Sequence, residues 1–291
     1  MWDRLVSWTI TFWVGAAALI GALYMLSFVV PKAAFAARAL ASYLCLLFCS
    51  SYGVIVSIIF RLIGIAGSSQ WAAGRMFKYT MYLTTGVTFE IIDPHGILDS
   101  VRPAVLVGNH QTELDVLMLG CVFPRNCTVT AKASLKKIPF LGWFMALSKT
   151  IFIDRGNAKD ARQAMKSAGQ EIARRGQSVY VFPEGTRSYS KEPMLLPFKK
   201  GAFHLAVEAG APIVPCVVAN YSHVLFIKSL VFGSGKIPVK VLAPIPTKGL
   251  NAADVEKLVN DTREKMLQEL ITLTAEARGS VPAAITVPAS K

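Results

Sequence analysis

The fold is decided by residues 104–115, which read AVLVGNHQTELD. The first four, Ala104–Val107, are apolar and form a short predicted strand, and a helix is predicted to follow through Leu119. Gly108 and Asn109 supply the turn between them. Because a strand that passes directly into a helix is the building unit of a sheet covered by helices, the stretch predicts an α/β fold.

Strands and helices continue to alternate on both sides of this stretch. Further strands are predicted over Val87–Ile92, Thr128–Ala131, Thr150–Ile153, Ser178–Phe182, Ile213–Val218 and Val239–Leu242. Helices are predicted over Trp71–Leu83, over Lys159–Arg175, and over an apolar stripe from Val255 to Ile271. We expect a mixed sheet flanked by helices over residues 67–278 and a flexible tail over residues 279–291.

Two uncharged runs precede this body, Leu5–Val30 with 26 residues and Ala39–Phe60 with 22. Because about 20 apolar residues in a helix cross the hydrocarbon core of a bilayer, either run is long enough to span it. A cleaved signal peptide is the alternative. The first run is too long for a signal sequence, and Asp3 offsets the charge of Arg4 in front of it. Residues 1–66 are therefore predicted to form a membrane-embedded two-helix segment.

The chain is strongly basic, with a formal net charge of +13. Residues 1–60 contribute +2 of this charge, so the body carries the remaining +11. A basic body beside an apolar anchor indicates an anionic bilayer surface or a phosphorylated substrate. A nucleic acid is disfavoured because no nucleic-acid-binding module is recognisable. The five cysteines lack the paired spacing of a zinc site or a disulfide framework, so no metal is expected and a reducing compartment is indicated.

His110 and Asp115 form the first candidate site, directly after the predicted strand Ala104–Val107. Five-residue spacing sets two side chains roughly 140° apart on a continuous helix, so they can meet only if His110 lies in the turn and Asp115 in the first helical turn. Asp115 would then hold one ring nitrogen and leave the other to accept a proton, as in a general base. The alternative is that Asp115 only caps the helix with Thr112, and that His110 is a solvated turn residue.

The second candidate site is the loop of residues 182–188, FPEGTRS, which follows another predicted strand. Gly185 favours a tight turn, and Arg187 offers a planar set of hydrogen-bond donors that suits a phosphate. Thr186 would add a hydroxyl donor. The alternative is an ordinary polar loop in which Glu184 and Arg187 pair with each other.

A third segment, residues 132–144, reads KASLKKIPFLGWF. It places Lys132, Lys136 and Lys137 beside apolar and aromatic residues. Such a segment suits an anionic head group above an acyl chain, and it suits an interfacial membrane anchor equally well.

In this order, the segments resemble the motifs of the glycerolipid acyltransferases, most closely the fungal-type 1-acyl-sn-glycerol-3-phosphate acyltransferases. The HxxxxD motif of that family is matched by His110 and Asp115, and its EGTR motif by residues 184–187. Residues 132–143 and 152–155 resemble the second block of the family, and residues 212–215 resemble the fourth. The resemblance covers about residues 82–242, and the order of the four blocks makes it specific.

The resemblance implies an acyltransferase catalytic domain over residues 67–278 and a mechanism. His110, oriented by Asp115, would take the proton from the sn-2 hydroxyl of lysophosphatidic acid, which would attack the thioester of acyl-CoA to give phosphatidic acid. Acyl-CoA would be a co-substrate, and no other cofactor is implied. The residues assigned to substrate binding are Asn109, Lys132, Glu184, Gly185, Thr186 and Arg187, with Arg187 on the phosphate.

Two alternatives in function remain open at this point. The same machinery would serve another acceptor, such as lysophosphatidylcholine or glycerol-3-phosphate. A non-catalytic lipid-binding membrane protein would keep the fold, although it would not need a positioned base. The sequence indicates no oligomeric state.

The resemblance also implies an integral membrane protein of the endoplasmic reticulum or of lipid droplets. If both apolar runs cross the membrane, the N-terminus and the body share one side, which carries Arg4, Arg61, Arg75 and Lys78. The positive-inside rule then predicts that the body faces the cytosol.

Overall fold

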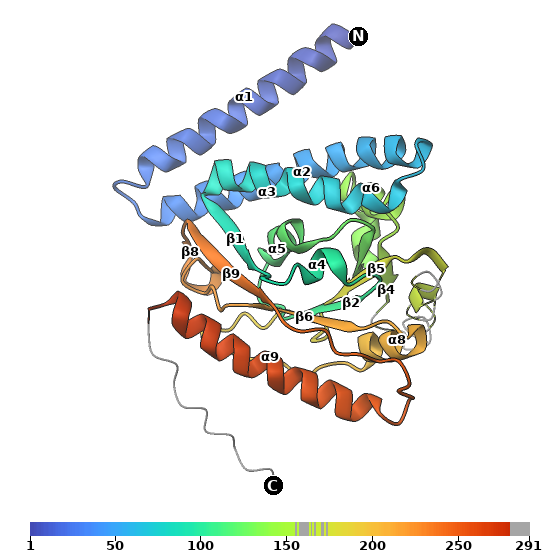
Figure 1. Ribbon diagram of the computed structural model, residues 1–291. Helices are drawn as coiled ribbons and strands as arrows, with labels where there is room; N and C mark the ends of the chain where they lie inside the picture. Colours follow the sequence, from blue (N-terminus) through green and yellow to red (C-terminus); the bar gives the residue numbers. More distant parts are fainter. Residues whose placement is uncertain are drawn as a thin grey trace.

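The computed structural model has a central sheet between two layers of helices (Figure 1). The structure describes residues 1–154 and 174–279, together with residues 156, 163, 165, 167–169 and 172. The helix predicted over Lys159–Arg175 therefore lies largely outside the described residues. The predicted tail beyond residue 279, and Arg155 of the second motif block, also lie outside them.

The sheet has seven strands in the order β1-β9-β6-β2-β5-β3-β4. They are β1 (Val87–Ile92), β2 (Val105–Gly108), β3 (Cys127–Lys132), β4 (Ile151–Ile153), β5 (Ser178–Val181), β6 (Ile213–Val218) and β9 (Gly235–Val241). Every neighbouring pair is parallel except β6 and β9, so the predicted mixed sheet is confirmed. β9 begins at Gly235, four residues before the predicted start at Val239. The added part contains Pro238, and a proline usually argues against a strand in the sequence.

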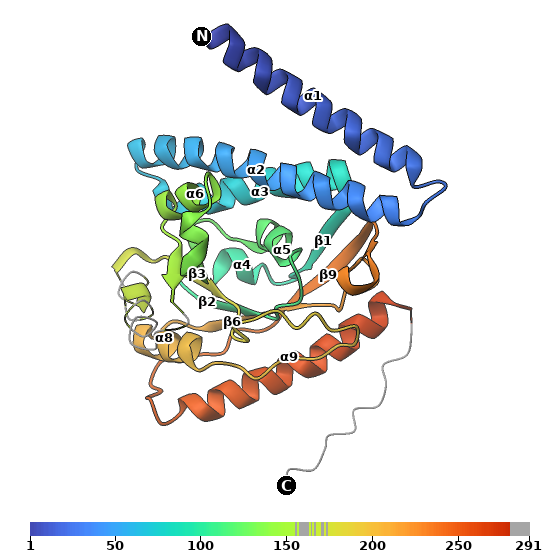
Figure 2. The same cartoon turned by 180° about the vertical axis from the view of Figure 1, so that it is seen from behind.

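Helices cover both faces of the sheet (Figures 1 and 2). One face carries α2 (Lys32–Leu62), α3 (Ser69–Thr85), α5 (Asp115–Val122) and α6 (Leu141–Leu147), and the other carries α8 (Gly201–Ala209) and α9 (Val255–Ala277). Shorter elements are η1 (Ala66–Ser68), α4 (Ile97–Ser100), η2 (Ala133–Lys137), η3 (Ile227–Ser229), and a hairpin of β7 (Leu225–Phe226) and β8 (Val231–Phe232). The α/β fold is confirmed, although α8 and the hairpin were not predicted.

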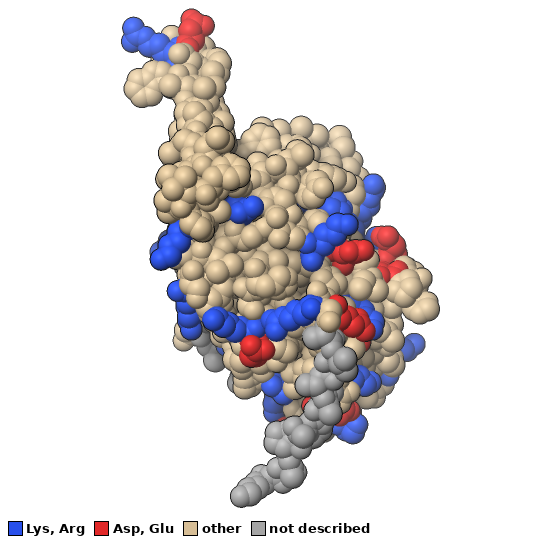
Figure 3. All heavy atoms as spheres, turned by 90° about the vertical axis from the view of Figure 1, so that its left-hand side faces the viewer, with Lys and Arg blue, Asp and Glu red and all other residues tan. Residues whose placement is uncertain are grey.

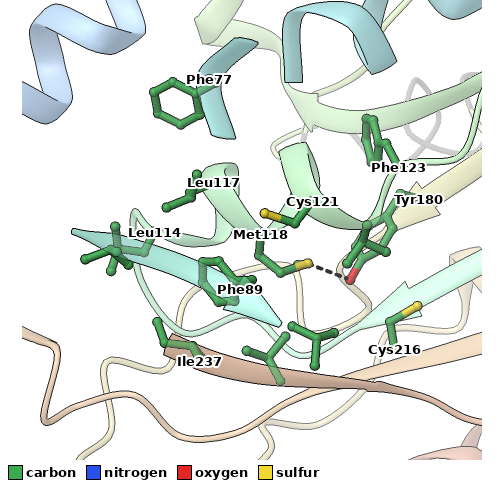
Figure 4. Close-up of a cluster of buried hydrophobic side chains, with 14 of the residues drawn as sticks. Phe77, Phe89, Leu114, Leu117, Met118, Cys121, Phe123, Tyr180, Cys216 and Ile237 are labelled. Carbon is green, nitrogen blue, oxygen red and sulfur yellow. Dashed lines mark hydrogen bonds between the residues drawn. The ribbon is translucent and has the colours of Figure 1, made fainter. Parts of the chain in front are cut away.

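The core lies on both faces of β2. Leu106 of this strand belongs to the cluster under α3 and α5, where Met118 of α5 packs beside Tyr180 of β5 and accepts a hydrogen bond from its hydroxyl (Figure 4). Val105 and Val107 point to the opposite side and join the cluster formed with α8 and α9. Burial on both faces explains why β2 is a continuous apolar run in the sequence.

The two N-terminal helices differ in their contact with the body. α1 (Trp2–Leu26) projects away from it and buries no residue, and Figure 3 shows its flank without charged side chains below the N-terminal tip. α2 lies along the body and buries a stripe at four-residue spacing: Ala33, Ala37, Ala41, Cys45, Cys49 and Gly53. Its outward residues, among them Tyr43, Ile55 and Leu62, are exposed. Both helices are long and apolar enough to cross a membrane, which indicates membrane association.

Candidate active site

His110 and Asp115 lie beyond the carboxyl end of β2. His110 stands in the turn, and Asp115 is the first residue of α5. Nδ1 of His110 lies 2.7 Å from Oδ2 of Asp115, and the ring stacks on Phe182 with the centroids 4.1 Å apart. Because a carboxylate only accepts hydrogen bonds, the proton of the neutral ring belongs on Nδ1, and Nε2 keeps its lone pair. The structure thus brings the two predicted side chains together.

Asp115 accepts four hydrogen bonds and is almost fully buried. Besides His110, Oδ2 accepts from the backbone N–H groups of Gln111 at 2.6 Å and Thr112 at 3.1 Å, and Oδ1 accepts from the Tyr221 hydroxyl at 2.7 Å. Burial and the Asp115 charge raise the pKa of Tyr221 well above its usual value, so the hydroxyl stays a donor. Asp115 therefore shapes the turn and also orients the ring. Tyr221 was not predicted, although it follows β6 at the same edge of the sheet.

The loop of residues 182–188 is fastened to the turn that carries His110. β5 is the parallel neighbour of β2, so both loops leave the sheet at one edge. Oε1 of Glu184 accepts a hydrogen bond from the His110 N–H at 2.7 Å, and the Ser188 N–H donates to the His110 carbonyl at 2.9 Å. Oε2 of Glu184 accepts from the Leu196 N–H at 2.9 Å. The sheet and these bonds fix the relative position of the two motifs.

Asn109, Glu184 and Gly185 support the site from behind. Asn109 is buried, and both of its amide atoms bind the backbone of Val218, at 2.8 and 2.9 Å. Both carboxylate oxygens of Glu184 are taken by backbone donors, and burial raises the pKa of Glu184 to about 7. Gly185 has a φ of +69°, which favours glycine. These contacts support the two loops of the site, and the role in substrate binding that the resemblance implied for the three residues stays a prediction.

Arg187 pairs with Glu113, so the predicted alternative of a Glu184–Arg187 pair is wrong. Nη1 of Arg187 lies 3.0 Å from Oε1 of Glu113, which also accepts from the Tyr189 hydroxyl at 2.6 Å. Burial disfavours the cation of Arg187, but the Tyr189 hydroxyl and the Glu113 charge outweigh burial and raise its pKa. Neither Glu113 nor Tyr189 was predicted, since their contact depends on how the two loops meet.

A cavity of about 410 Å³ opens beside His110. Its lining also includes Thr186, Arg187 and Lys132. Lys136 and Lys137, the other two lysines of the segment 132–144, are not part of this lining. The remaining lining is largely apolar and includes Leu46, Phe77, Val116, Leu119, Phe123, Leu141, Phe144 and Met145. The volume is typical of a small-molecule or lipid-chain site. Within the described residues, no group of His, Cys, Asp or Glu is placed to hold a metal ion.

This chain resembles known proteins in sequence and in fold. The sequence model of the family described as "Acyltransferase" matches residues 92–219, which contain both motifs. The fold resembles the crystal structure of the 1-acyl-sn-glycerophosphate (LPA) acyltransferase PlsC from Thermotoga maritima, with a TM-score of 0.62 and 22% identity. The match covers 88% of this chain and 96% of that one.

Two sequence relatives have a higher sequence identity to this chain than PlsC has. The chain is 42% identical over 222 residues to the 1-acyl-sn-glycerol-3-phosphate acyltransferase of Saccharomyces cerevisiae. The matched segment covers 76% of this chain and 73% of the relative. It is 42% identical over 192 residues to 1-acyl-sn-glycerol-3-phosphate acyltransferase beta of Homo sapiens, which covers 66% of each. Because this identity extends over most of both chains, the chain belongs to the 1-acyl-sn-glycerol-3-phosphate acyltransferase family of enzymes.

Proposed function

We propose that this protein transfers the acyl group of acyl-CoA to the sn-2 hydroxyl of 1-acyl-sn-glycerol-3-phosphate, which gives phosphatidic acid and free CoA. The observation that carries the proposal is the pairing of His110 with Asp115 at the wall of a largely apolar cavity that Arg187 also lines. A base, a cation and an apolar chamber match a substrate with a hydroxyl, a phosphate and an acyl chain. The names of the relatives support lysophosphatidic acid as this substrate.

The reaction needs one proton to be moved twice. Nε2 of His110 takes the proton of the acceptor hydroxyl as its oxygen attacks the thioester carbonyl of acyl-CoA. Asp115, held in place by Tyr221, stabilises the resulting imidazolium. When the carbon–sulfur bond breaks, the imidazolium returns the proton to the CoA thiolate. The acceptor hydroxyl is the nucleophile, so the step needs no covalent acyl-enzyme and no cofactor besides the acyl-CoA co-substrate.

Substrate binding follows from the lining of the cavity. Arg187 binds the phosphate of the acceptor through its planar donors, and the Thr186 hydroxyl adds a further donor. Lys132 lies at the end of β3 on the same cavity and contributes a second cation for anionic substrate groups. The apolar lining between α2, α3 and α6 suits an acyl chain, because each buried methylene contributes about 0.8 kcal/mol.

The N-terminal helices support a position of this cavity beside a membrane. We propose that α1 and α2 embed in the endoplasmic reticulum, or in a lipid-droplet surface derived from it, with the catalytic body on the cytosolic side. α2 lines the cavity through Leu46, Cys49 and Ser50 while its opposite side is exposed, so the cavity lies directly beneath the surface that we propose faces the membrane. Protease added to sealed microsomes should digest the body, and full protection would contradict this orientation.

Acceptor competition with the purified full-length protein tests the function. One acyl-CoA is supplied with lysophosphatidic acid, lysophosphatidylcholine or glycerol-3-phosphate, and the acylated products are quantified. We expect phosphatidic acid to be the main product and His110→Ala to form none. Preferred acylation of another acceptor would transfer the assignment to that lipid. If the wild-type protein acylated none of the three acceptors, the result would favour the alternative function of non-catalytic lipid binding over the proposed acyl transfer.

A further inference from the structure

The cation assigned to the acceptor phosphate is already engaged in this structure. Nη1 of Arg187 lies 3.0 Å from Oε1 of Glu113 and 3.3 Å from the Tyr189 hydroxyl. The Tyr189 hydroxyl donates to the same Oε1 at 2.6 Å. Glu113 therefore has its negative charge at the guanidinium that the phosphate must reach. Nothing in the acyl-transfer chemistry requires a carboxylate at this position.

The cluster also has unused hydrogen-bonding capacity. Nε of Arg187 and Oε2 of Glu113 are both buried, and neither has a hydrogen-bond partner among the described residues. A buried donor of a charged group is costly to leave unpaired, so a phosphate oxygen at Nε would remove an existing penalty. Oε2 of Glu113 has the opposite effect on phosphate binding, because its negative charge repels a second anion. The same cluster thus attracts a phosphate through one atom and opposes it through another.

Glu113 is held firmly enough to exert this effect. It lies in the turn between His110 and Asp115, and its side chain is about 39% exposed, with Arg187 at 35%. A charge at this depth is screened less than one on the open surface. The bond from Tyr189 keeps the carboxylate beside Arg187, and the backbone of Tyr189 is in turn bound to the Gln111 carbonyl at 3.2 Å.

We propose that the negative charge of Glu113 weakens the binding of phosphorylated lipids to Arg187, so that the phosphatidic acid product and free phosphate anions bind loosely. This inference rests on the proposed function, because it requires that Arg187 binds the acceptor phosphate. The substrate and the product have the same phosphomonoester group. A site that gripped this group without opposition would also retain its product, whereas the Glu113 charge lowers the affinity for both and speeds release.

Glu113→Gln tests the proposal, because the amide oxygen still accepts from Arg187 and Tyr189 while the charge is removed. The measurements are KM for lysophosphatidic acid, KM for acyl-CoA, and inhibition constants for phosphatidic acid and inorganic phosphate. We expect the acceptor KM and both inhibition constants to fall about tenfold, equivalent to about 1.4 kcal/mol, with a change in the acyl-CoA KM below about twofold. Glu276→Gln, at an exposed position near the end of α9, is the matched control and should alter none of these values.

Two results would overturn the proposal. An acceptor KM that stays constant or rises in Glu113→Gln would show that the carboxylate only positions Arg187. Unchanged inhibition by phosphatidic acid would show that the charge has no effect on the phosphate. Arg187→Lys separates this failure from failure of the proposed function. If Arg187→Lys raises the acceptor KM alone, Arg187 still binds the phosphate and only the role of Glu113 is lost. If it does not, the phosphate assignment fails as well.

Discussion

Oδ2 of Asp115 binds both the ring of His110 and the backbone that holds that ring in place. It lies 2.7 Å from Nδ1 and 2.6 Å from the Gln111 N–H, the next residue in the chain. One oxygen thus fixes the position of the turn and the direction of the imidazole. Such sharing explains how a five-residue spacing, which would separate the side chains on a continuous helix, brings them into contact here.

Asp115→Asn should therefore lower kcat by at least about a hundredfold while the protein stays folded, since loss of an oriented general base removes about 10²–10⁴-fold in rate. An asparagine oxygen in the Oδ2 position still accepts from the Gln111 N–H and from Nδ1, but it lacks the negative charge that would stabilise the imidazolium. Steady-state kinetics in detergent micelles measures the effect, with Tyr221→Phe as a milder comparison that removes one hydrogen bond to Oδ1. Near wild-type turnover in Asp115→Asn would mean that Asp115 only shapes the turn.

The central strands of the sheet and the pair of His110 and Asp115 could be predicted from the sequence. β2 and β6 are buried on both faces and are continuous apolar runs, which local patterning reveals. α8 was not predicted, although Ala202, Leu205, Ala206 and Ala209 have helical spacing before Gly210. The partners Glu113, Tyr189 and Tyr221 were not predicted, because each contact joins segments that only the fold brings together.

Arg187→Lys should raise the apparent KM for the phosphorylated acceptor about tenfold to a hundredfold, because a charge-assisted hydrogen bond contributes about 1.5–3 kcal/mol and lysine lacks the planar fork. The KM for acyl-CoA should change far less. Initial-rate measurements that vary each substrate in turn give both values. Equal increases for the two substrates would indicate that the substitution deforms the loop and that Arg187 has no particular role at the phosphate.

Glu184 should make the protein less stable as the pH rises. Burial raises its pKa from 4.5 to about 7, so the folded protein holds this proton more tightly than the unfolded chain. Its stabilising contribution is fully present below about pH 4.5 and is lost as the pH rises through 7. Glu184→Gln cannot titrate, so its stability relative to wild type should increase across that interval. Thermal unfolding in detergent at several pH values measures this difference, and a constant difference would refute the titration.

Gly120→Ala should destabilise the protein and perturb the cavity. A Cβ at Gly120 would lie 2.5 Å from the carbonyl oxygen of Gly74, where α3 crosses α5, and both glycines line the cavity. Forcing the helices apart is expected to cost about 1–3 kcal/mol. Gly15→Ala on α1 is the matched control, because nothing lies within 4 Å of its added Cβ. Equal melting temperatures for the two variants in detergent would contradict the close approach of α3 and α5.

The exposed side of α2 should contact lipid. Tyr43 and Ile55 are 69% and 58% exposed on this side, while the opposite stripe packs on the body. Each is replaced in turn by cysteine and labelled with an environment-sensitive fluorophore. The five native cysteines are buried, which favours labelling of the introduced thiol. In vesicles, both labels should emit at shorter wavelength than in water and be quenched by lipids with a spin label on the acyl chain.

A label at Lys265 provides the control, because this residue is exposed on α9, which covers the other face of the sheet. Its emission should match that of a solvated fluorophore and resist quenching by the lipids. The contrast follows from geometry: a bilayer that holds α1 and the outward side of α2 lies on the side of the sheet away from α9 (Figure 1). Solvated emission from both α2 positions in vesicles would show that this surface is not in the membrane. The cavity beneath α2 would then need another route for its lipid substrate.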